Sequence, residues 1–308
     1  MGPVGEEPVR VSFAVGALTF YPVATTFAFA AEGGAQGVEL LVDSSILARG
    51  PERYSRMATQ HKLPVLTVHS MLQFRKQSLI ETIANDVASI RFAATIPTCE
   101  AVVLHPPMTG PRPSPDLNRW LEAISQARAE SCNPNLRLGL ENRGENHDGV
   151  EAQFLDDLAR LRRLAEEWDL SITLDIAHAA SHGLEVIAAT QACLPKLANV
   201  HLSDANDREM RGGVRNGLFR DHQVPGEGRL PLAEVVGALR AGGYRGPLTI
   251  ELSPMSLRAF WPPAAKRRAR LAIQRVQEFV RPAPATLSWS RSFAPPPVPR
   301  REESHEDA

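Results

Sequence analysis

Short apolar segments alternate with longer amphipathic segments along most of the chain. The apolar segments are rich in Val, Ile and Leu and lie at 10–15, 37–42, 64–69, 100–105, 136–141, 171–175, 198–202 and 247–251. The amphipathic segments lie at 23–34, 50–61, 75–94, 115–131, 151–168, 183–193, 231–242 and 263–280. Such apolar runs are typical of strands buried on both faces, and the amphipathic segments have helical spacing. The alternation predicts parallel strands joined by crossover helices.

Eight such units predict an α/β fold in the form of a single closed (β/α)8 barrel, because closure leaves no strand edge exposed. The chain has 308 residues, and a barrel of this kind needs about 250. The alternative, a doubly wound sheet, requires a glycine-rich phosphate loop after an early strand. Gly33-Gly34 falls instead at a helix end and is typical of a C-cap. We therefore predict one barrel domain at residues 10–281, preceded by an N-terminal extension at 1–9.

Two segments fall outside the repeat. Residues 204–228 form a long connection rich in Arg, Asp and Gly, and connections of this length within a compact domain are usually functional. Residues 282–308 are rich in proline and then in charge, so we expect a disordered tail. A proline-rich motif that binds a partner is the alternative for the tail.

Composition narrows the class of protein. The formal net charge is −1, which argues against a strongly basic nucleic-acid binder. Cys99, Cys132 and Cys193 are scattered, which argues against a disulfide scaffold or zinc ribbon and favours the reducing cytoplasm. The uncharged run at 11–31 is interrupted by a glycine and a proline and contains the first predicted strand. We therefore expect neither a signal peptide nor a membrane span there.

Four acidic or imidazole side chains stand at the ends of four predicted strands. They are Glu141 in LGLEN, Asp175 in ITLDIAH, His201 in NVHLSD and Glu251 in LTIELS. Parallel barrel strands bring their carboxyl ends to one rim, so we expect these side chains to meet. Clustered carboxylates repel one another unless a cation neutralises them. Two Glu, one Asp and one His are suitable ligands for a hard-to-borderline divalent metal.

Further histidines accompany this group. His69 and His105 end the third and fourth predicted strands, and His178 follows Asp175 by three residues. His222 lies in the long connection, directly after Asp221. Each can be a capping or supporting residue, a substrate-binding residue or an additional ligand, and the residues alone leave these alternatives open.

These motifs resemble those of a known superfamily. The matching phrases are GVELLVD, VVLHPP, LGLEN, LDIAHAASHG, VHLSDAN and PGEGRLPLAEVVGALRAGGYRGPLTIE, spread over residues 10–282. Together they are similar to the xylose-isomerase-like TIM barrels. That superfamily includes sugar (phosphate) isomerases and epimerases and the endonuclease IV type of AP endonuclease. The phrases are specific for the superfamily and less specific for an activity within it.

The isomerase branch implies a divalent-metal enzyme that acts on a small sugar, keto-sugar or sugar phosphate through an enediolate. The resemblance implies one Mn²⁺, Mg²⁺ or Co²⁺ held by Glu141, Asp175, His201 and Glu251. It also implies that Glu141 and Glu251 are the catalytic acid–base pair, and we expect substrate contacts from His69, His105, His178, Arg220 and His222. We take this branch as the expected function, with a sugar as small-molecule partner and without a nucleic-acid or membrane partner. A homodimer is left open.

The endonuclease branch is the principal alternative. It implies a zinc-dependent phosphodiesterase with three Zn²⁺ ions, in which the additional ligands are His69, His105, His178 and His222. One departure weakens it, because that branch has Asp-x-His in the long connection. Here Arg220 stands at the aligned Asp position and Asp221 adjoins His222, so the third zinc site is in doubt. A lyase similar to inosose dehydratase is a further alternative, since an enediolate can also expel a hydroxyl group.

Overall fold

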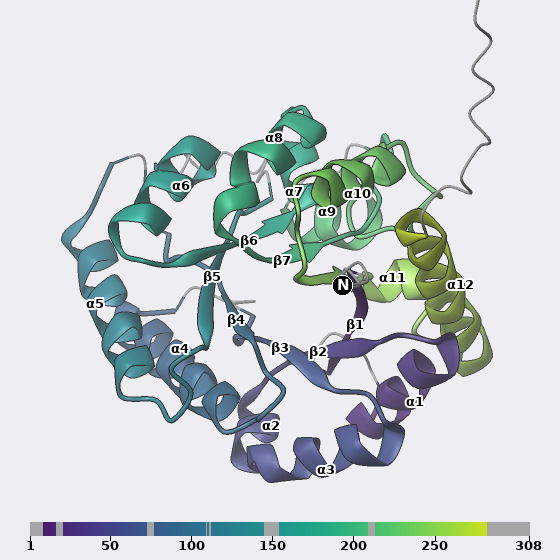
Figure 1. Ribbon diagram of the computed structural model, residues 1–308, viewed down its shortest axis with the longest axis horizontal. Coiled ribbons are helices and arrows are strands. Elements are labelled where there is room, and N and C mark those ends of the chain that lie inside the picture. Colours follow the sequence, from purple (N-terminus) through teal and green to yellow (C-terminus); the bar gives the residue numbers. More distant parts are fainter. Residues whose placement is uncertain are drawn as a thin grey trace, which may run out of the picture.

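Eight parallel strands close into a barrel in the order in which they follow one another along the chain. The computed structural model describes residues 9–16, 21–72, 77–108, 110, 112–144, 154–208 and 213–281. The strands are β1 (Arg10–Gly16), β2 (Gly37–Leu41), β3 (Val65–His69), β4 (Ala101–Leu104), β5 (Arg137–Glu141), β6 (Ser171–Asp175), β7 (Leu197–His201) and β8 (Pro247–Ile250). β1 also pairs with β8, which closes the ring seen in Figure 1. The predicted single (β/α)8 barrel is confirmed.

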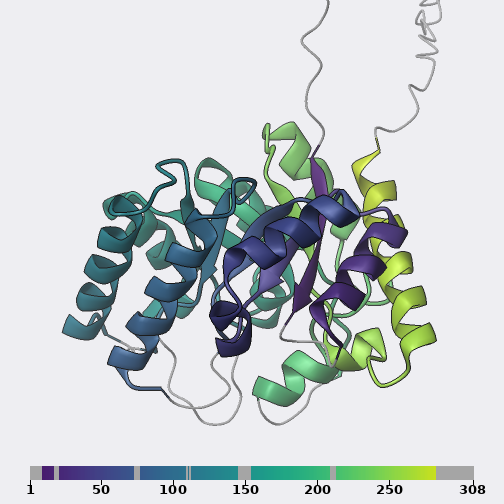
Figure 2. The same cartoon turned by 90° about the horizontal axis from the view of Figure 1, so that it is seen from below.

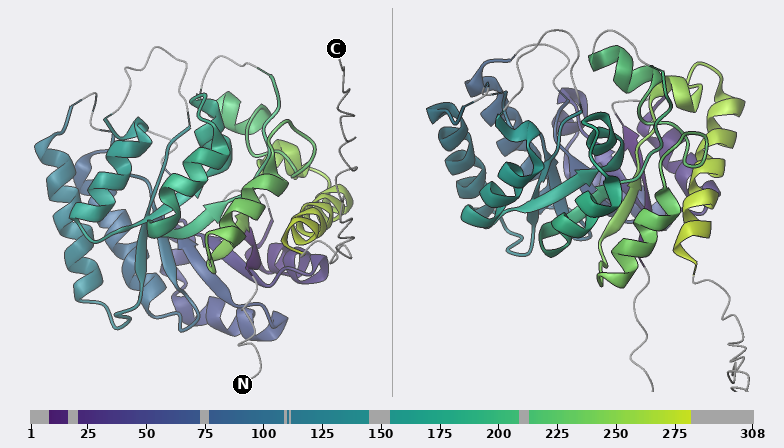
Figure 3. Two further views of the ribbon diagram at one scale, coloured as in Figure 1. Left: turned by 45° about the horizontal axis from the view of Figure 1, so that its top comes forward. Right: turned by 90° about the horizontal axis from the view of Figure 1, so that it is seen from above.

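Helices surround the ring of strands (Figure 3). They are α1 (Val23–Gly33), α2 (Ser44–Ala48), α3 (Pro51–His61), α4 (Leu79–Ala94), α5 (Pro115–Ala129), α6 (Leu158–Glu167), α7 (Ile176–Ser181), α8 (Val186–Cys193), α9 (Gly213–Phe219), α10 (Leu232–Ala241), α11 (Pro254–Leu257) and α12 (Pro262–Val280). None of these described helices is long and apolar enough to cross a membrane. The predicted tail at 282–308 and the first eight residues of the predicted extension lie outside the described part of the chain.

Helix boundaries differ from the prediction where a capping residue decides them. α4 begins at Leu79 rather than at 75, because Ser78 and Glu81 form a reciprocal capping box. α6 begins at Leu158 rather than at 151, because the Asp157 side chain accepts hydrogen bonds from two backbone N–H groups of its first turn. The predicted C-cap of α1 is confirmed, since Gly34 has a φ of 87°.

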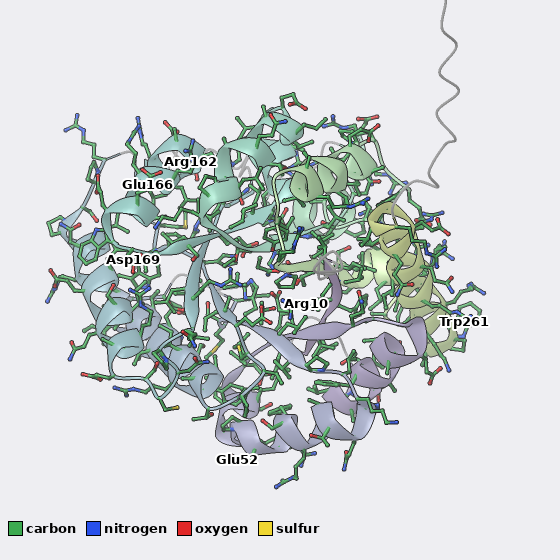
Figure 4. All side chains as sticks on the ribbon, viewed as in Figure 1. Arg10, Glu52, Arg162, Glu166, Asp169 and Trp261 are labelled. Atoms are coloured by element: carbon green, nitrogen blue, oxygen red, sulfur yellow. The ribbon has the colours of Figure 1, made fainter. Side chains whose placement is uncertain are left out.

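Apolar side chains fill the space between strands and helices, whereas charges gather outside. Trp120, Tyr54, Phe13 and Phe27 are among the largest fully buried side chains. Figure 4 shows charged side chains on the periphery of the helical ring, labelled at Glu52, Arg162, Glu166 and Asp169. The same view places Arg10, the first residue of β1, within the ring of helices.

The barrel interior carries a layer of polar side chains halfway along the strands. Glu39 of β2, Thr67 of β3, Asn199 of β7 and Thr249 of β8 are all fully buried and hydrogen-bond to one another. Side chains two residues apart on a strand share a face. The next inward positions on β3 and β7 are therefore His69 and His201, and on the β8 side Glu251. The rim where the four predicted site residues end thus lies directly above a polar interior layer.

Candidate metal centre

The structure brings together the four side chains predicted to meet at the rim. Glu141, Asp175 and His201 are the last residues of β5, β6 and β7, and Glu251 directly follows β8. All four are buried, and one potential ligand atom from each lies within 4.8 Å of the others. His201 Nδ1 is 3.0 Å from Glu141 Oε1, 2.9 Å from Glu251 Oε2 and 3.7 Å from Asp175 Oδ2. We call these four residues the central group.

Two further groups adjoin the central group and share residues with it. His69 and His105 direct their Nε2 atoms at Glu141 Oε2, at 3.2 and 2.6 Å. On the other side, Asp175, His178 and His222 bring one potential ligand atom each within 4.8 Å of one another. Because Glu141 and Asp175 belong to two groups each, all the histidines predicted from the sequence lie around one continuous centre. Their roles as ligands or substrate-binding residues stay predictions.

A hydrogen bond to one nitrogen of each ring fixes which nitrogen carries a hydrogen. His69 Nδ1 lies 2.7 Å from the Ser70 carbonyl oxygen, and His178 Nδ1 lies 2.9 Å from that of Asn142. A carbonyl oxygen only accepts, so each Nδ1 carries a hydrogen. Nε2 of His69 then faces Glu141, and Nε2 of His178 faces His222. His201 is turned the other way from His69, with Nε2 hydrogen-bonded to Glu39 Oε2 at 3.3 Å and Nδ1 in the centre. Metal-binding histidines almost always have such a partner on the second nitrogen.

The carboxylates of the central group keep their negative charge. Burial by itself raises the pKa of Glu141, but the facing rings of His105 and His201 outweigh it and hold this pKa well below its ordinary value. The pKa of Glu251 is lowered too, because His201 outweighs the effect of burial. Burial lowers the pKa of His201, yet Glu39, Glu141 and Glu251 together raise it well above the ordinary value. The centre therefore requires positive charge, from a proton on His201 or from a cation.

A divalent cation fits the residues present. Asp175 Oδ1 accepts a hydrogen bond from the His178 backbone, whereas Asp175 Oδ2 is buried and has no hydrogen-bond partner among the described residues. A buried carboxylate oxygen without a partner is costly. That oxygen lies among the other ligand atoms of the central group, where a cation would compensate it. Carboxylate oxygens and imidazole nitrogens suit Mn²⁺, Co²⁺ and Zn²⁺, and the carboxylates also suit Mg²⁺.

Three supporting residues escaped the sequence analysis. The Asn142 side chain donates to the Asp175 carbonyl and accepts from the Asp175 N–H, at 2.9 and 2.8 Å, which fixes the end of β6 against β5. Glu39 and Asn199 lie in the interior layer below His201. Two of them have a signal in the sequence. Asn199 precedes His201 by two residues, and Glu39 is a lone charge within an apolar strand.

The long connection is anchored by one carboxylate. Asp204 Oδ1 accepts hydrogen bonds from the backbone N–H groups of Ala205 and Leu230, and Oδ2 from those of Gly226 and Gly228, at 2.9–3.0 Å. A Cβ at Gly228 would lie 2.3 Å from Asp204 Oδ1, so only glycine fits this turn. The connection also contains α9, which contacts α11 beyond β8 and lies at the opposite end of the barrel from the start of β1 (Figure 2). This anchoring positions His222 over the centre.

Arg220 pairs with its neighbour in the chain. Its Nε and Nη2 atoms donate to the two carboxylate oxygens of Asp221 at 2.9 and 3.1 Å, and both side chains are buried. Asp221 is absent from the potential ligand groups found among the described residues, whereas His222 belongs to one. The group around His222 consists of Asp175, His178 and His222, and the doubt about a third zinc site stays a prediction. A substrate contact from Arg220 stays a prediction.

Comparisons with known proteins agree with this architecture. The chain is 26% identical over 267 residues to an uncharacterised protein of Mycobacterium tuberculosis, which covers 80% of this chain and 88% of that protein. A similar solved structure is 3-keto-D-glucoside 4-epimerase from E. coli, with 19% identity, a TM-score of 0.62 and coverage of 86% of this chain and 100% of that one. Another is the family 2 AP endonuclease of Brucella melitensis, with 19% identity, a TM-score of 0.57 and coverage of 80% and 93%.

At 19% identity, the similarity to these two structures shows a shared fold and no more. The sequence identifies the family more specifically, because a family model matches residues 27–278. This range includes every strand from β2 to β8 and the whole candidate centre. The chain belongs to the xylose isomerase-like TIM barrel family.

Proposed function

We propose that the protein is a divalent-metal-dependent isomerase or epimerase that moves a proton at carbon in a small sugar, keto-sugar or sugar phosphate. The observation that carries this proposal is the convergence of Glu141 and Glu251 on one imidazole nitrogen, at 3.0 and 2.9 Å from His201 Nδ1. These glutamates end β5 and follow β8, with β6 and β7 between them. They therefore approach the centre from two directions, as a pair acting on two faces of one substrate must.

The two glutamates would transfer the proton, and the histidines would hold the substrate. One glutamate removes a proton from the carbon beside the carbonyl group, and the other returns a proton to the opposite face or the adjacent carbon. Their lowered pKa values keep both ionised in the resting protein, so the glutamate that returns a proton first takes one up from solvent. His178 and His222 hold substrate oxygens through their Nε2 atoms. A cation bound by the central group would supply electrostatic stabilisation of the negative charge that develops on those oxygens.

Support for a carbohydrate substrate comes from the family and from the fold neighbour that is a 3-keto-D-glucoside 4-epimerase. The test is incubation with a panel of keto-sugars and sugar phosphates in deuterated water, with Mn²⁺, Mg²⁺ or Co²⁺ added. We expect a product of unchanged composition that carries solvent deuterium on carbon. A product lighter by one water would indicate the lyase instead.

Variants assign the acid–base pair. Glu141→Gln and Glu251→Gln should each abolish turnover and leave the fold intact. Glu166→Gln is the matched control, because this side chain is 56% exposed on α6. Retained turnover in either central variant contradicts the acid–base assignment.

A second candidate, a zinc-dependent phosphodiesterase, is favoured by the two adjoining groups. The specific observation is that Glu141 and Asp175 each belong to two of the three potential ligand groups, an arrangement suited to bridging several ions. Metal content separates the two functions. One equivalent of manganese, magnesium or cobalt per chain supports the isomerase, whereas two or three equivalents of zinc together with cleavage of abasic DNA or another phosphodiester support the hydrolase.

A further inference from the structure

The Glu39 carboxylate lies inside the barrel, one layer below the candidate metal centre. It is fully buried, and its Oε2 accepts hydrogen bonds from Thr67 Oγ1 and Asn199 Nδ2, both at 2.8 Å. His201 Nε2 hydrogen-bonds to the same Oε2 at 3.3 Å; it also lies 3.0 Å from Oε1, which has no hydrogen-bond partner among the described residues. Within the described residues, His201 is the one basic side chain paired with Glu39. The carboxylate is thus held by three groups from β3 and β7, and one of them is an imidazole of the central group.

A buried carboxylate at this position lowers the stability of the folded protein. Moving an ionised carboxylate out of water costs several kcal/mol even after pairing, and the interiors of such barrels are usually filled by branched apolar side chains. Val or Leu at position 39 would fill the same space without a buried charge if the side chains that donate to Glu39 were also apolar. A role at the neighbouring centre therefore explains the residue better than stability does.

The hydrogen-bond directions specify what Glu39 does to His201. An ionised carboxylate only accepts, so Glu39 requires a hydrogen on His201 Nε2, and Glu141 and Glu251 require one on Nδ1 unless a cation takes its place. In a neutral ring facing a cation, the hydrogen therefore lies on Nε2. The lone pair then lies on Nδ1, which is the atom that faces Glu141, Asp175 and Glu251. The carboxylate also makes Nδ1 more basic and therefore a stronger metal ligand.

A relay of polar groups fixes Glu39 in turn. Thr249 Oγ1 donates to Asn199 Oδ1 at 2.9 Å, which orients the amide so that Nδ2 points at Glu39. Together with Thr67, this relay holds the carboxylate from the two sides of the barrel interior. Four strands thus contribute to the orientation of one ring.

We propose that Glu39 is a positioning residue that fixes the tautomer and orientation of His201 and so sets the affinity of the central group for a divalent cation. The proposal rests on the metal-binding part of the proposed function and is independent of the substrate. The competing explanation is that the interior layer only holds the strands together. In that case changes to it alter stability and leave metal affinity unchanged.

The experiment measures the affinity of the full-length, metal-stripped protein for Co²⁺ by competition with a chelator, together with the visible spectrum of the cobalt form. Glu39→Gln keeps the shape but removes the charge. It should weaken Co²⁺ binding about 10- to 100-fold, as is typical for such partners of metal ligands, and shift the cobalt spectrum. Thr67→Val removes one donor to Glu39 and should weaken binding in the same direction by a smaller factor.

Thr173→Val is the matched control. Its hydroxyl group is buried on β6 and has no hydrogen-bond partner among the described residues, so the substitution should leave Co²⁺ affinity and spectrum unchanged. Wild-type affinity in Glu39→Gln, or an equal loss in Thr173→Val, overturns the proposal. If Glu39→Gln fails to fold, Thr67→Val decides, and unaltered Co²⁺ affinity in that variant overturns it.

The two proposals fail separately. A wild-type protein that binds Co²⁺ with the expected dependence on Glu39 but moves no proton in any sugar refutes the isomerase and leaves the role of Glu39 intact. A wild-type protein that binds no divalent cation refutes both.

Discussion

The Nε2 atoms of His178 and His222 face each other at 3.2 Å, although the two residues are 44 positions apart in the chain. The Asn142 carbonyl oxygen takes the Nδ1 hydrogen of His178, so Nε2 of its neutral ring offers a lone pair. His222 reaches this position with a φ of 53°, a left-handed conformation that is uncommon for residues other than glycine. Two ring nitrogens held in this way can hydrogen-bond to a substrate hydroxyl group or coordinate one metal ion together.

Replacing His222 distinguishes these two uses. Under the proposed function one cation lies in the central group, so His222→Gln should leave the metal content per chain unchanged. It should raise KM roughly tenfold, as the loss of one hydrogen bond worth about 1.4 kcal/mol predicts. Elemental analysis and steady-state kinetics measure the two effects. His61→Gln on α3 is the control and should change neither. A zinc content of two or three per wild-type chain that falls in His222→Gln would favour the hydrolase.

Removal of the metal should destabilise the fold. The central group places the carboxylates of Glu141, Asp175 and Glu251 around one point, and a cation that binds only the folded chain adds stability by mass action. At a free cation concentration of one hundred times Kd this amounts to about 2.7 kcal/mol. We therefore expect Tm to fall when a chelator is added and to recover when Mn²⁺ or Co²⁺ is restored. Glu251→Gln should show a smaller response, and an unchanged Tm on chelation contradicts a resident metal.

The anchor of the long connection gives a prediction about stability. In Asp204→Asn, one carboxylate oxygen becomes an NH2 group that faces the N–H groups of two backbone residues. Each buried donor left without an acceptor costs about 1–3 kcal/mol. The free energy of unfolding in urea should fall accordingly, and hydrogen exchange should accelerate at Gly226 and Gly228. Asp207→Asn is the control, because that side chain is 86% exposed and pairs with Arg229. Equal behaviour of the two variants would show that Asp204 does not anchor the connection.

The sequence revealed the barrel and the central group because both depend on strand periodicity. Glu141, Asp175 and His201 end their strands, and parallel closure alone makes them meet. The pattern marks Glu39 as a lone charge but does not show what it contacts, since Glu39 and Asn199 are 160 positions apart and their strands are not neighbours in the sheet. The pairing of Arg220 with Asp221 was also hidden, because the sequence shows that two charges adjoin but not which way each side chain points.

The pH dependence of stability should report on a second buried carboxylate, Asp86 of α4. Burial raises its pKa to about 7, although hydrogen bonds from Trp120 and Ser70 oppose this rise. Trp120 Nε1 donates to Asp86 Oδ2 at 2.8 Å. The unfolded chain has the ordinary Asp pKa of 3.8, so between these two values the folded state binds more protons. Asp86 therefore contributes fully below the unfolded pKa, and its contribution is lost as pH rises through about 7.

Asp86→Asn removes this titration and keeps an oxygen that can accept from Trp120. Relative to the variant, the wild-type protein should lose stability between pH 5 and pH 7 with a slope of up to about 1.4 kcal/mol per pH unit. Urea unfolding of both proteins at a series of pH values measures the difference, with chelator present throughout so that metal binding does not contribute. Asp116→Asn, in the first turn of α5, is the control and should follow the wild-type curve. Parallel curves for the wild-type protein and Asp86→Asn would mean that this carboxylate is ionised in the folded chain and that another group compensates its charge.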